Sequence, residues 1–393
     1  MIKAKKNRMW LLGVILASYF VVGFPDGAFT ISWHGITAEI SGMTTAHTGY
    51  ILVGYSVTYT LAGILLARLT HFIKLQTVYL YGLLIMGLGF VGLALSANFA
   101  WVLATITVYG FGTGLMASSM NSYMAKHFTA RHNNWMHCFW GAGATLSPII
   151  MGQMMAVLSW RAGYFAITGI LAVVAIMLLI SMYKKIWLDE ENSPQHEAEK
   201  TTEKKRYLTK KWHQTVEILT FFFLGGTDYT LVFFTGAALI ARGHETAYTV
   251  AIFSAIYYIG MTSGRMFFGW AAKWLKEVPI VRIGAVIAIA GVAVLYFTSN
   301  AAGMALAGFG LGPMLPTLVS DSSNRFTPRI LSKIVGYELA AFGAGIAVLF
   351  FITSQILHFI SYEALFPLGL TFIILVVLCN EVLAYALKMS NKS

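Results

Sequence analysis

Long apolar runs, separated by short polar stretches, follow one another along almost the whole chain. Runs of about 20 apolar residues with few charges are long enough to cross a bilayer as helices. The pattern predicts twelve membrane-spanning helices, at residues 9–35, 46–70, 76–97, 100–125, 134–158, 160–183, 213–240, 247–272, 279–298, 301–322, 332–357 and 362–387. The composition agrees, since 58% of the 393 residues are hydrophobic and only 11% are charged. We therefore expect an all-α membrane protein.

One long polar stretch divides the spans into two sets of six. Residues 184–212 hold an acidic group at 189–191, a basic group at 204–206 and few large apolar side chains. This composition is typical of a cytoplasmic linker. We predict an N-terminal six-helix bundle at residues 1–183, the linker at 184–212 and a C-terminal six-helix bundle at 213–393.

The basic residues are distributed unevenly among the loops. Most of the 27 lie in or beside the terminal tails, the even-numbered loops or the linker, and the two in odd-numbered loops are Arg161 and Arg242. Cytoplasmic loops of membrane proteins carry such an excess, so both termini are expected in the cytoplasm. The net charge of +11 thus reflects topology, and we expect no nucleic-acid partner. The expected location is a bacterial cytoplasmic (inner) membrane.

The two halves repeat each other in sequence. The segment GFGTGLM at 110–116 matches GFGLGPM at 308–314, and the Gly-Ala-Gly segment at 141–143 matches the one at 343–345. Asp26 and Asp228 are separated by 202 residues, and each follows a glycine by three positions. Two pseudo-symmetric bundles of this kind hold their binding site near the middle of the membrane, between the halves.

These segments carry a family resemblance. GFGLGPMLP at 308–316, WGAGATLSP at 140–148 and the helix-one aspartate Asp26 resemble the fucose-permease-like branch of the major facilitator superfamily. The resemblance covers the whole chain. It implies two six-helix bundles that rock about a central site, and it implies that Asp26 takes part in proton coupling and sugar binding.

The chain departs from the family pattern at two places. The loop after the second span has Gly63 and Arg68 but lacks the acid that usually precedes the arginine, so a gating role is carried over to Arg68 alone. The branch also has a glutamate on its fourth helix, where this chain offers only the polar Asn121. Either Asp26 couples alone, or Asp228, Glu338 or His137 takes over, or the protein is not a proton symporter.

Carboxylates inside the predicted spans are the main candidates for chemistry. A charge near the middle of a bilayer costs a few kcal/mol, so it is normally retained for a task. We assign proton coupling to Asp26, Asp228 and Glu338. Asp26 follows Pro25, which removes a backbone hydrogen bond and predicts a local break in the helix. Glu217 lies on the face of Asp228, and we expect it to be a solvated salt-bridge residue at the cytoplasmic mouth.

Other polar and aromatic residues are candidates for substrate contact. His137 and Glu338 precede the matching Gly-Ala-Gly segments, and Trp140 shares the helical face of His137. The predicted substrate-binding residues are Asn121, His137, Trp140, Tyr257, Asp228 and Glu338. Arg265 either balances the buried acids or reaches toward the cytoplasmic surface, and we favour the second role. Glu381 is expected to pair with a neighbouring helix.

The favoured function is secondary active transport by alternating access, with proton-coupled symport of a sugar or similar small polar solute. Acids outnumber bases inside the spans, which argues against an anionic substrate. The alternative is a proton-driven exporter of cationic or lipophilic compounds, whose pocket could use the 18 methionines. A membrane-embedded enzyme or a non-transporting receptor would need a clustered nucleophile or metal set, or an appended soluble domain. The sequence pattern indicates neither, so we disfavour this class.

The expected partners are a small-molecule substrate, protons and the lipid bilayer, with sodium as an alternative coupling ion because carboxylates also bind it. The chain contains two cysteines, both inside predicted spans, and no Cys/His spacing typical of a metal site. We expect no metal, no cofactor and a monomer.

Overall fold

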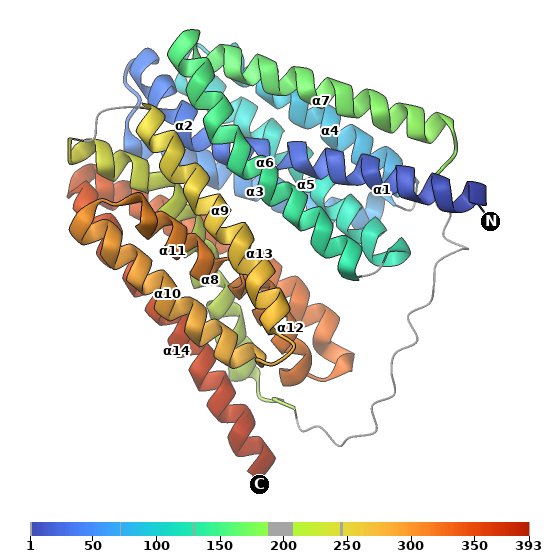
Figure 1. Ribbon diagram of the computed structural model, residues 1–393, viewed down its shortest axis with the longest axis vertical. Helices are drawn as coiled ribbons and strands as arrows, with labels where there is room; N and C mark the ends of the chain where they lie inside the picture. The colour runs from blue at the N-terminus through green and yellow to red at the C-terminus, as the bar shows by residue number, and fades with distance from the viewer. Residues whose placement is uncertain (1, 71, 129, 188–206, 244–246, 393) are drawn as a thin grey trace. The chain divides into compact units, whose positions relative to one another are not determined.

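The computed structural model describes residues 2–70, 72–128, 130–187, 207–243 and 247–392, which form a set of long helices (Figure 1). In chain order these are α1 (Ile2–Val22), α2 (Phe24–Glu39), α3 (Thr45–Leu69), α4 (Leu75–Ala94), α5 (Phe99–His127), α6 (Ala130–Val157), α7 (Trp160–Tyr183), α8 (Lys211–Ala241), α9 (Ala247–Ala271), α10 (Glu277–Thr298), α11 (Ala301–Leu311), α12 (Met314–Arg325), α13 (Pro328–Phe359) and α14 (Leu365–Lys392). A short 3₁₀ turn, η2 (Tyr362–Ala364), precedes α14. No strand occurs in these ranges, and the all-α prediction is confirmed.

Each of the twelve predicted spans coincides with one helix or with a broken pair of helices. The first span is divided into α1 and α2, and the tenth into α11 and α12. Within the described residues, ten helical stretches are long and apolar enough to cross a membrane. The hydrophobic pattern therefore predicted the elements correctly, with boundaries that differ by a few residues.

Prolines mark both broken spans. In the first span α1 ends at Val22 and α2 begins at Phe24, so Pro25 lies in the first turn of α2, where its missing N–H costs least. The predicted break at Pro25 is confirmed. Asp26 lies in the same turn, where the partial positive charge of a helix N-terminus favours a carboxylate. The break of the tenth span at Pro313 was not predicted.

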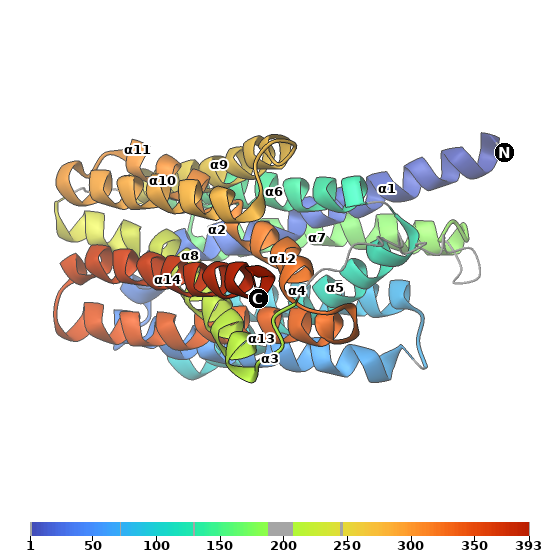
Figure 2. The ribbon, with the colours of Figure 1, turned by 90° about the horizontal axis from the view of Figure 1, so that it is seen from below.

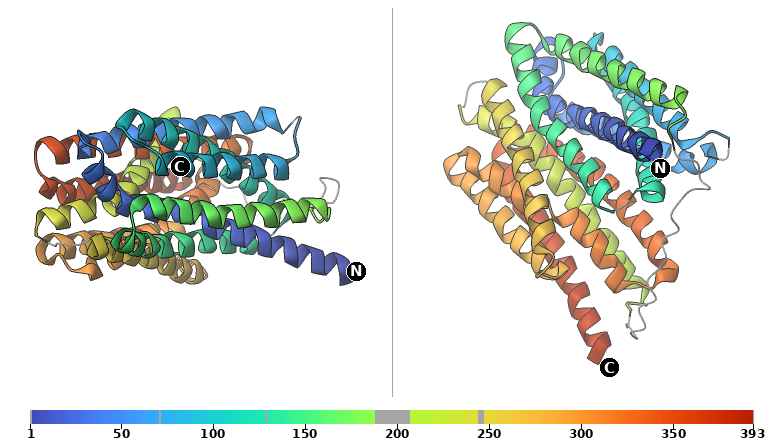
Figure 3. Two further views of the ribbon diagram at one scale, coloured as in Figure 1. Left: turned by 90° about the horizontal axis from the view of Figure 1, so that it is seen from above. Right: turned by 45° about the vertical axis from the view of Figure 1, so that its right-hand side comes forward.

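The helices form two compact units. The N-terminal unit contains residues 1–43 and 53–199, and the C-terminal unit contains residues 44–52 and 200–393. In the first, α4 lies along α5, α2 packs on α6, and α7 runs beside α1 (Figure 3). In the second, α8 packs on α13 and α14, while α11 packs against both α9 and α10 (Figure 2).

Close helix contacts at glycine occur at equivalent places in both units. A Cβ on Gly143 would overlap the carbonyl oxygen of Phe20, and a Cβ on Gly345 would overlap that of Phe222. Both glycines and both carbonyls are related by 202 residues. Inside a membrane, where apolar burial against lipid gives little advantage, such close backbone contact is what fixes a helix pair. The sequence repeat therefore appears in the structure as a repeated helix crossing.

In each unit an ion pair joins helix ends, and the acidic and basic partners are exchanged between the two units. Arg161 Nη2 lies 2.8 Å from Glu39 Oε1, and Arg242 Nη2 lies 2.5 Å from Glu363 Oε2. Arg161 and Glu363 occupy positions separated by 202 residues, so the repeat retains the pair but reverses its polarity. The hydrogen bond to Glu363 raises the pKa of the Arg242 guanidinium. The two basic residues in odd-numbered loops are thus both neutralised by acids.

The glycine crossings give a stability prediction. Gly345→Ala places a methyl group against the Phe222 carbonyl, and overpacking of this kind costs about 1–3 kcal/mol. The matched control is Gly336→Ala on the same helix, since a Cβ there meets nothing within 4 Å. Thermal unfolding of both variants in detergent measures the difference. Equal midpoints for the two variants would contradict the role of the crossing.

Candidate functional site

A carboxylate and a tyrosine meet inside the C-terminal unit. Asp228 lies on α8, and the phenol of Tyr257 on α9 donates a hydrogen bond to its Oδ1. Tyr257 is fully buried, while Asp228 is half-buried. The hydroxyl fixes the direction of the carboxylate, and the tyrosine ring supplies an apolar face beside it. The structure thus brings together two residues that were both predicted to bind substrate.

Arg265 gives this pair a positive neighbour. Its charge acts on Asp228, and its Nε donates to the carbonyl oxygen of Gly312 at 3.0 Å. That carbonyl lacks the usual helical partner, because the residue four positions later is Pro316, which has no N–H. The arginine therefore satisfies a carbonyl that the proline leaves open. Of the two roles expected for Arg265, its effect on Asp228 agrees with the balancing of a buried acid, and the favoured reach toward the cytoplasmic surface stays a prediction.

The N-terminal unit contains a related arrangement around Asp26. The negative charge of Asp26 acts on the phenols of Tyr55 and Tyr59, both on α3. The ring of Tyr55 stacks on that of Tyr109, with centroids 5.0 Å apart. Tyr55 and Tyr257 are separated by 202 residues, as are Asp26 and Asp228. A carboxylate beside a tyrosine is thus repeated in the two units.

Sequence reasoning missed Tyr55, although a signal was available. The offset of 202 residues that relates the two aspartates also relates Tyr55 to Tyr257, which was predicted. The two units differ at the position of Arg265, because the corresponding residue of the N-terminal unit is Gly63. The repeat therefore relates the two carboxylate–tyrosine pairs but does not repeat Arg265.

The remaining predicted contact residues of the N-terminal unit lie on α5 and α6. The ring of His137 meets that of Tyr19 edge-on, with centroids 6.0 Å apart. The backbone of Trp140 passes so close to Gly23 that a Cβ there would overlap its carbonyl oxygen. Asn121 is exposed, and its amide donates to the Ala117 carbonyl one turn earlier at 2.9 Å. Their roles in binding stay predictions.

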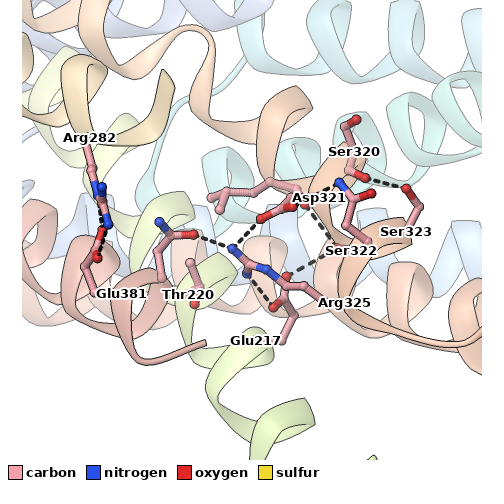
Figure 4. A network of polar contacts seen from close by, with 12 residues as sticks. Glu217, Thr220, Arg282, Ser320, Asp321, Ser322, Ser323, Arg325 and Glu381 are labelled. Atoms are coloured by element: carbon pink, nitrogen blue, oxygen red, sulfur yellow. Dashed lines mark hydrogen bonds and ion pairs between the residues drawn. The ribbon is translucent and has the colours of Figure 1, made fainter. Parts of the chain in front are cut away.

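Glu338 lies in a different place from Asp228. Its Oε1 is 2.6 Å from Ser322 Oγ, which in turn is 3.2 Å from Glu217 Oε1 (Figure 4). Glu217 and Asp228 are 11 residues apart on α8, or about 16 Å along the helix axis. The structure therefore groups Glu338 with Glu217, about three turns of α8 away from Asp228.

Glu217 differs from its prediction in one respect. It forms the expected salt bridge, with Arg325 Nη1 at 2.7 Å from its Oε2. The side chain is not solvated, however, because Glu217 is 0% exposed and Arg325 is 1% exposed. Arg325 was not predicted as its partner. Burial by α12, α13 and α14 was not visible from the position of Glu217 near Lys210.

Two further predicted residues lie at the surface of their helices. Glu381 pairs with Arg282 on α10, with Nη2 and Oε2 2.6 Å apart, which confirms the expected contact with a neighbouring helix. Arg68 is exposed in the last turn of α3. Its gating role stays a prediction.

Comparison with known proteins decides the family. The profile of the Major Facilitator Superfamily matches residues 15–349. The chain belongs to this superfamily. It is therefore a multi-pass membrane transporter and not an enzyme, and the resemblance seen in the sequence is confirmed. A search among curated protein sequences finds no match.

Solved structures of other superfamily members share the fold. A mutant of the nucleoside transporter NupG has a TM-score of 0.74 at 11% identity, with 95% of this chain and 99% of that chain covered. The transporter FucP, in the outward conformation, has a TM-score of 0.63 at 15% identity, with 95% and 98% covered. At such identities the likeness establishes the superfamily fold and leaves the substrate to be argued from the site.

The buried ion pair of this transporter gives a second stability prediction. Arg325→Met leaves Glu217 as a buried charge without its cation, which costs about 3–5 kcal/mol. The control is Arg282→Met, whose pair with Glu381 is largely solvated and contributes less than about 1 kcal/mol. Unfolding free energies in detergent measure both losses. Adding Glu217→Gln to Arg325→Met should restore part of the loss, and two equal single-variant losses would refute the assignment.

Proposed function

We propose that this transporter is a proton-coupled symporter of a sugar or a similar small polar solute, working by alternating access. The observation that carries the proposal is the repeated carboxylate–tyrosine pair, Asp26 with Tyr55 and Asp228 with Tyr257. Within each unit, the pair offers a carboxylate and a phenol to the hydroxyl groups of a solute. The tyrosine rings add faces on which a ring-shaped solute can stack.

The charge around Asp228 favours a neutral solute. Arg265 brings a positive charge near that acid, so the C-terminal pair offers hydrogen bonds with its negative charge partly offset. A cationic substrate would have to compete with Arg265 for the same carboxylate. This favours symport of a polar solute over export of cations. Nucleosides fall in the favoured class, and a nucleoside transporter is among the proteins that share the fold.

Proton coupling is assigned first to Asp26. Asp26 lies in the first turn after the helix break beside Pro25, and its charge acts on the phenols of Tyr55 and Tyr59. Asp228 accepts a hydrogen bond from Tyr257 and has the charge of Arg265 nearby. A proton on Asp26 would remove a charge whose desolvation opposes closure of the path around the solute. Asp228 then serves chiefly to bind the solute. Sodium is the alternative coupling ion.

The proposed setting is a cytoplasmic membrane, with both termini in the cytoplasm and the transporter acting as a monomer. The ion pairs of Arg161 with Glu39 and of Arg242 with Glu363 support this orientation. They neutralise the two basic residues that would otherwise weigh against the positive-inside pattern.

Uptake into proteoliposomes tests the function. A panel of sugars and nucleosides is offered under an inward proton gradient, and we expect one class to accumulate against its concentration gradient. Asp26→Asn should abolish this accumulation but retain exchange of the solute down its gradient, because only the proton site is removed. Expulsion of a lipophilic cation with no uptake of any polar solute would overturn the proposal. Normal accumulation by Asp26→Asn would remove that residue from coupling.

Tyr257→Phe tests the solute site. The variant keeps the ring but loses the hydrogen bond to Asp228, and such bonds to a charged group contribute about 1.5–3 kcal/mol. We expect KM for the solute to rise about tenfold or more while coupling to protons persists. The control is Tyr385→Phe, since Tyr385 is 66% exposed on α14. Unchanged KM in Tyr257→Phe would exclude the pair from solute binding.

A further inference from the structure

A buried arginine links three helices of the C-terminal unit at a distance from the carboxylate–tyrosine pair. Arg325 on α12 contacts Glu217 Oε2 at 2.7 Å, Asp321 Oδ2 at 2.6 Å and Asn380 Oδ1 at 2.5 Å (Figure 4). Arg325, Glu217 and Asn380 are at most 1% exposed. The guanidinium therefore contacts one acceptor on each of α8, α12 and α14.

The charges of this cluster do not balance if every acid is ionised. Glu217, Asp321 and Glu338 are three carboxyl groups, and Arg325 is the one guanidinium among the described side chains that contacts them. A buried carboxylate needs a positive partner or several hydrogen-bond donors. Arg325 provides direct contacts to Glu217 and Asp321 but none to Glu338. The cluster therefore has one acid more than its ion pairs can accommodate.

The hydrogen bonds of Ser322 indicate which of the three acids is protonated. Its Oγ lies 2.6 Å from Glu338 Oε1, 3.2 Å from Glu217 Oε1 and 3.0 Å from the Leu318 carbonyl. A serine hydroxyl has one hydrogen and cannot donate to three acceptors. A proton on Glu338 resolves the conflict, because Glu338 then donates to Ser322 Oγ. Ser322 remains free to donate to Glu217 or to the carbonyl.

The second oxygen of Glu338 supports the same assignment. Glu338 is 0% exposed, and its Oε2 is buried with no hydrogen-bond partner among the described residues. An ionised carboxylate would carry half its charge on that unpartnered atom, at a large desolvation cost. In a protonated carboxyl group the same atom is a neutral carbonyl oxygen, and leaving it unpaired costs far less.

We infer that Glu338 is a proton-binding site of the C-terminal unit, with Ser322 relaying its protonation to the Glu217–Arg325 ion pair. The described titratable and charged groups around this site are Glu217 from α8, Asp321 and Arg325 from α12 and, beside Glu217, Cys379 from α14. Loss of the proton adds a negative charge next to Glu217, which weakens the packing of α13 against α8 and α12. A role of Glu338 in proton coupling rests on the proposed function. The presence of a proton on Glu338 is independent of that function.

Infrared spectroscopy of the full-length protein in lipid nanodiscs tests the proton directly. A protonated carboxyl group has a C=O stretching band separate from those of carboxylates, and we expect one such band at neutral pH to disappear in Glu338→Gln. The control is Glu363→Gln, which removes an acid that is ion-paired with Arg242 and should leave the band intact. A Glu338→Gln spectrum that superimposes on the wild-type spectrum would overturn the inference.

A second variant keeps the test decisive if Glu338→Gln fails to fold. Ser322→Ala removes the acceptor of the Glu338 proton, so the wild-type band should move to the higher frequency of a carboxyl group without a hydrogen bond. An unmoved band would overturn the assignment of the proton to Glu338. The proteoliposome assay is independent of this result. If the protein shows the band but accumulates no polar solute, the proton site stands and the proposed function is refuted. If it accumulates a polar solute but shows no such band, the proposed function stands and the proton site is refuted.

Discussion

Close backbone contact at glycine is the constraint on which the rest of the fold depends. Helices in a bilayer gain little by hiding apolar side chains from equally apolar lipid, so van der Waals contact and hydrogen bonds must fix their crossings. Gly143 against Phe20 and Gly345 against Phe222 allow the first and fifth spans of each unit to approach at backbone distance. These crossings set the height and rotation of the helices that hold Asp26 and Asp228. The site is therefore positioned by residues that have no side chain.

Arginines occupy the places where the helices leave carbonyl oxygens or acids unsatisfied. Arg161 donates to the Ala94 carbonyl at the end of α4 as well as to Glu39, and Arg242 donates to the Tyr296 carbonyl near the end of α10 as well as to Glu363. Arg325 combines two acids with an amide oxygen. The guanidinium suits this use because it has five donors in a fixed plane and stays charged. Each of these arginines thus connects helices that are far apart in sequence.

The sequence predicted the helices, the repeat and the acid on a broken helix because each depends on local pattern. Hydrophobic runs give the spans, the offset of 202 residues gives the two units, and Pro25 gives the break beside Asp26. Partners across helices were harder to predict. Glu217 stands near lysines in the sequence, yet its partner Arg325 lies 108 residues away, on a helix whose rotation no local pattern reveals. Tyr55 could have been found, since the repeat offset already related it to Tyr257.

Pro316 shows how a missing hydrogen-bond donor can shape the surroundings of Asp228. Its lack of an N–H leaves the Gly312 carbonyl open, and Arg265, 47 residues earlier, fills that position. A residue that made the tenth span a more regular helix would close this carbonyl with a backbone bond and take away the arginine's anchor. A more regular helix at Gly312 would then leave the position of the Arg265 guanidinium near Asp228 less well fixed. In this span, irregularity of the backbone holds a charged side chain in place.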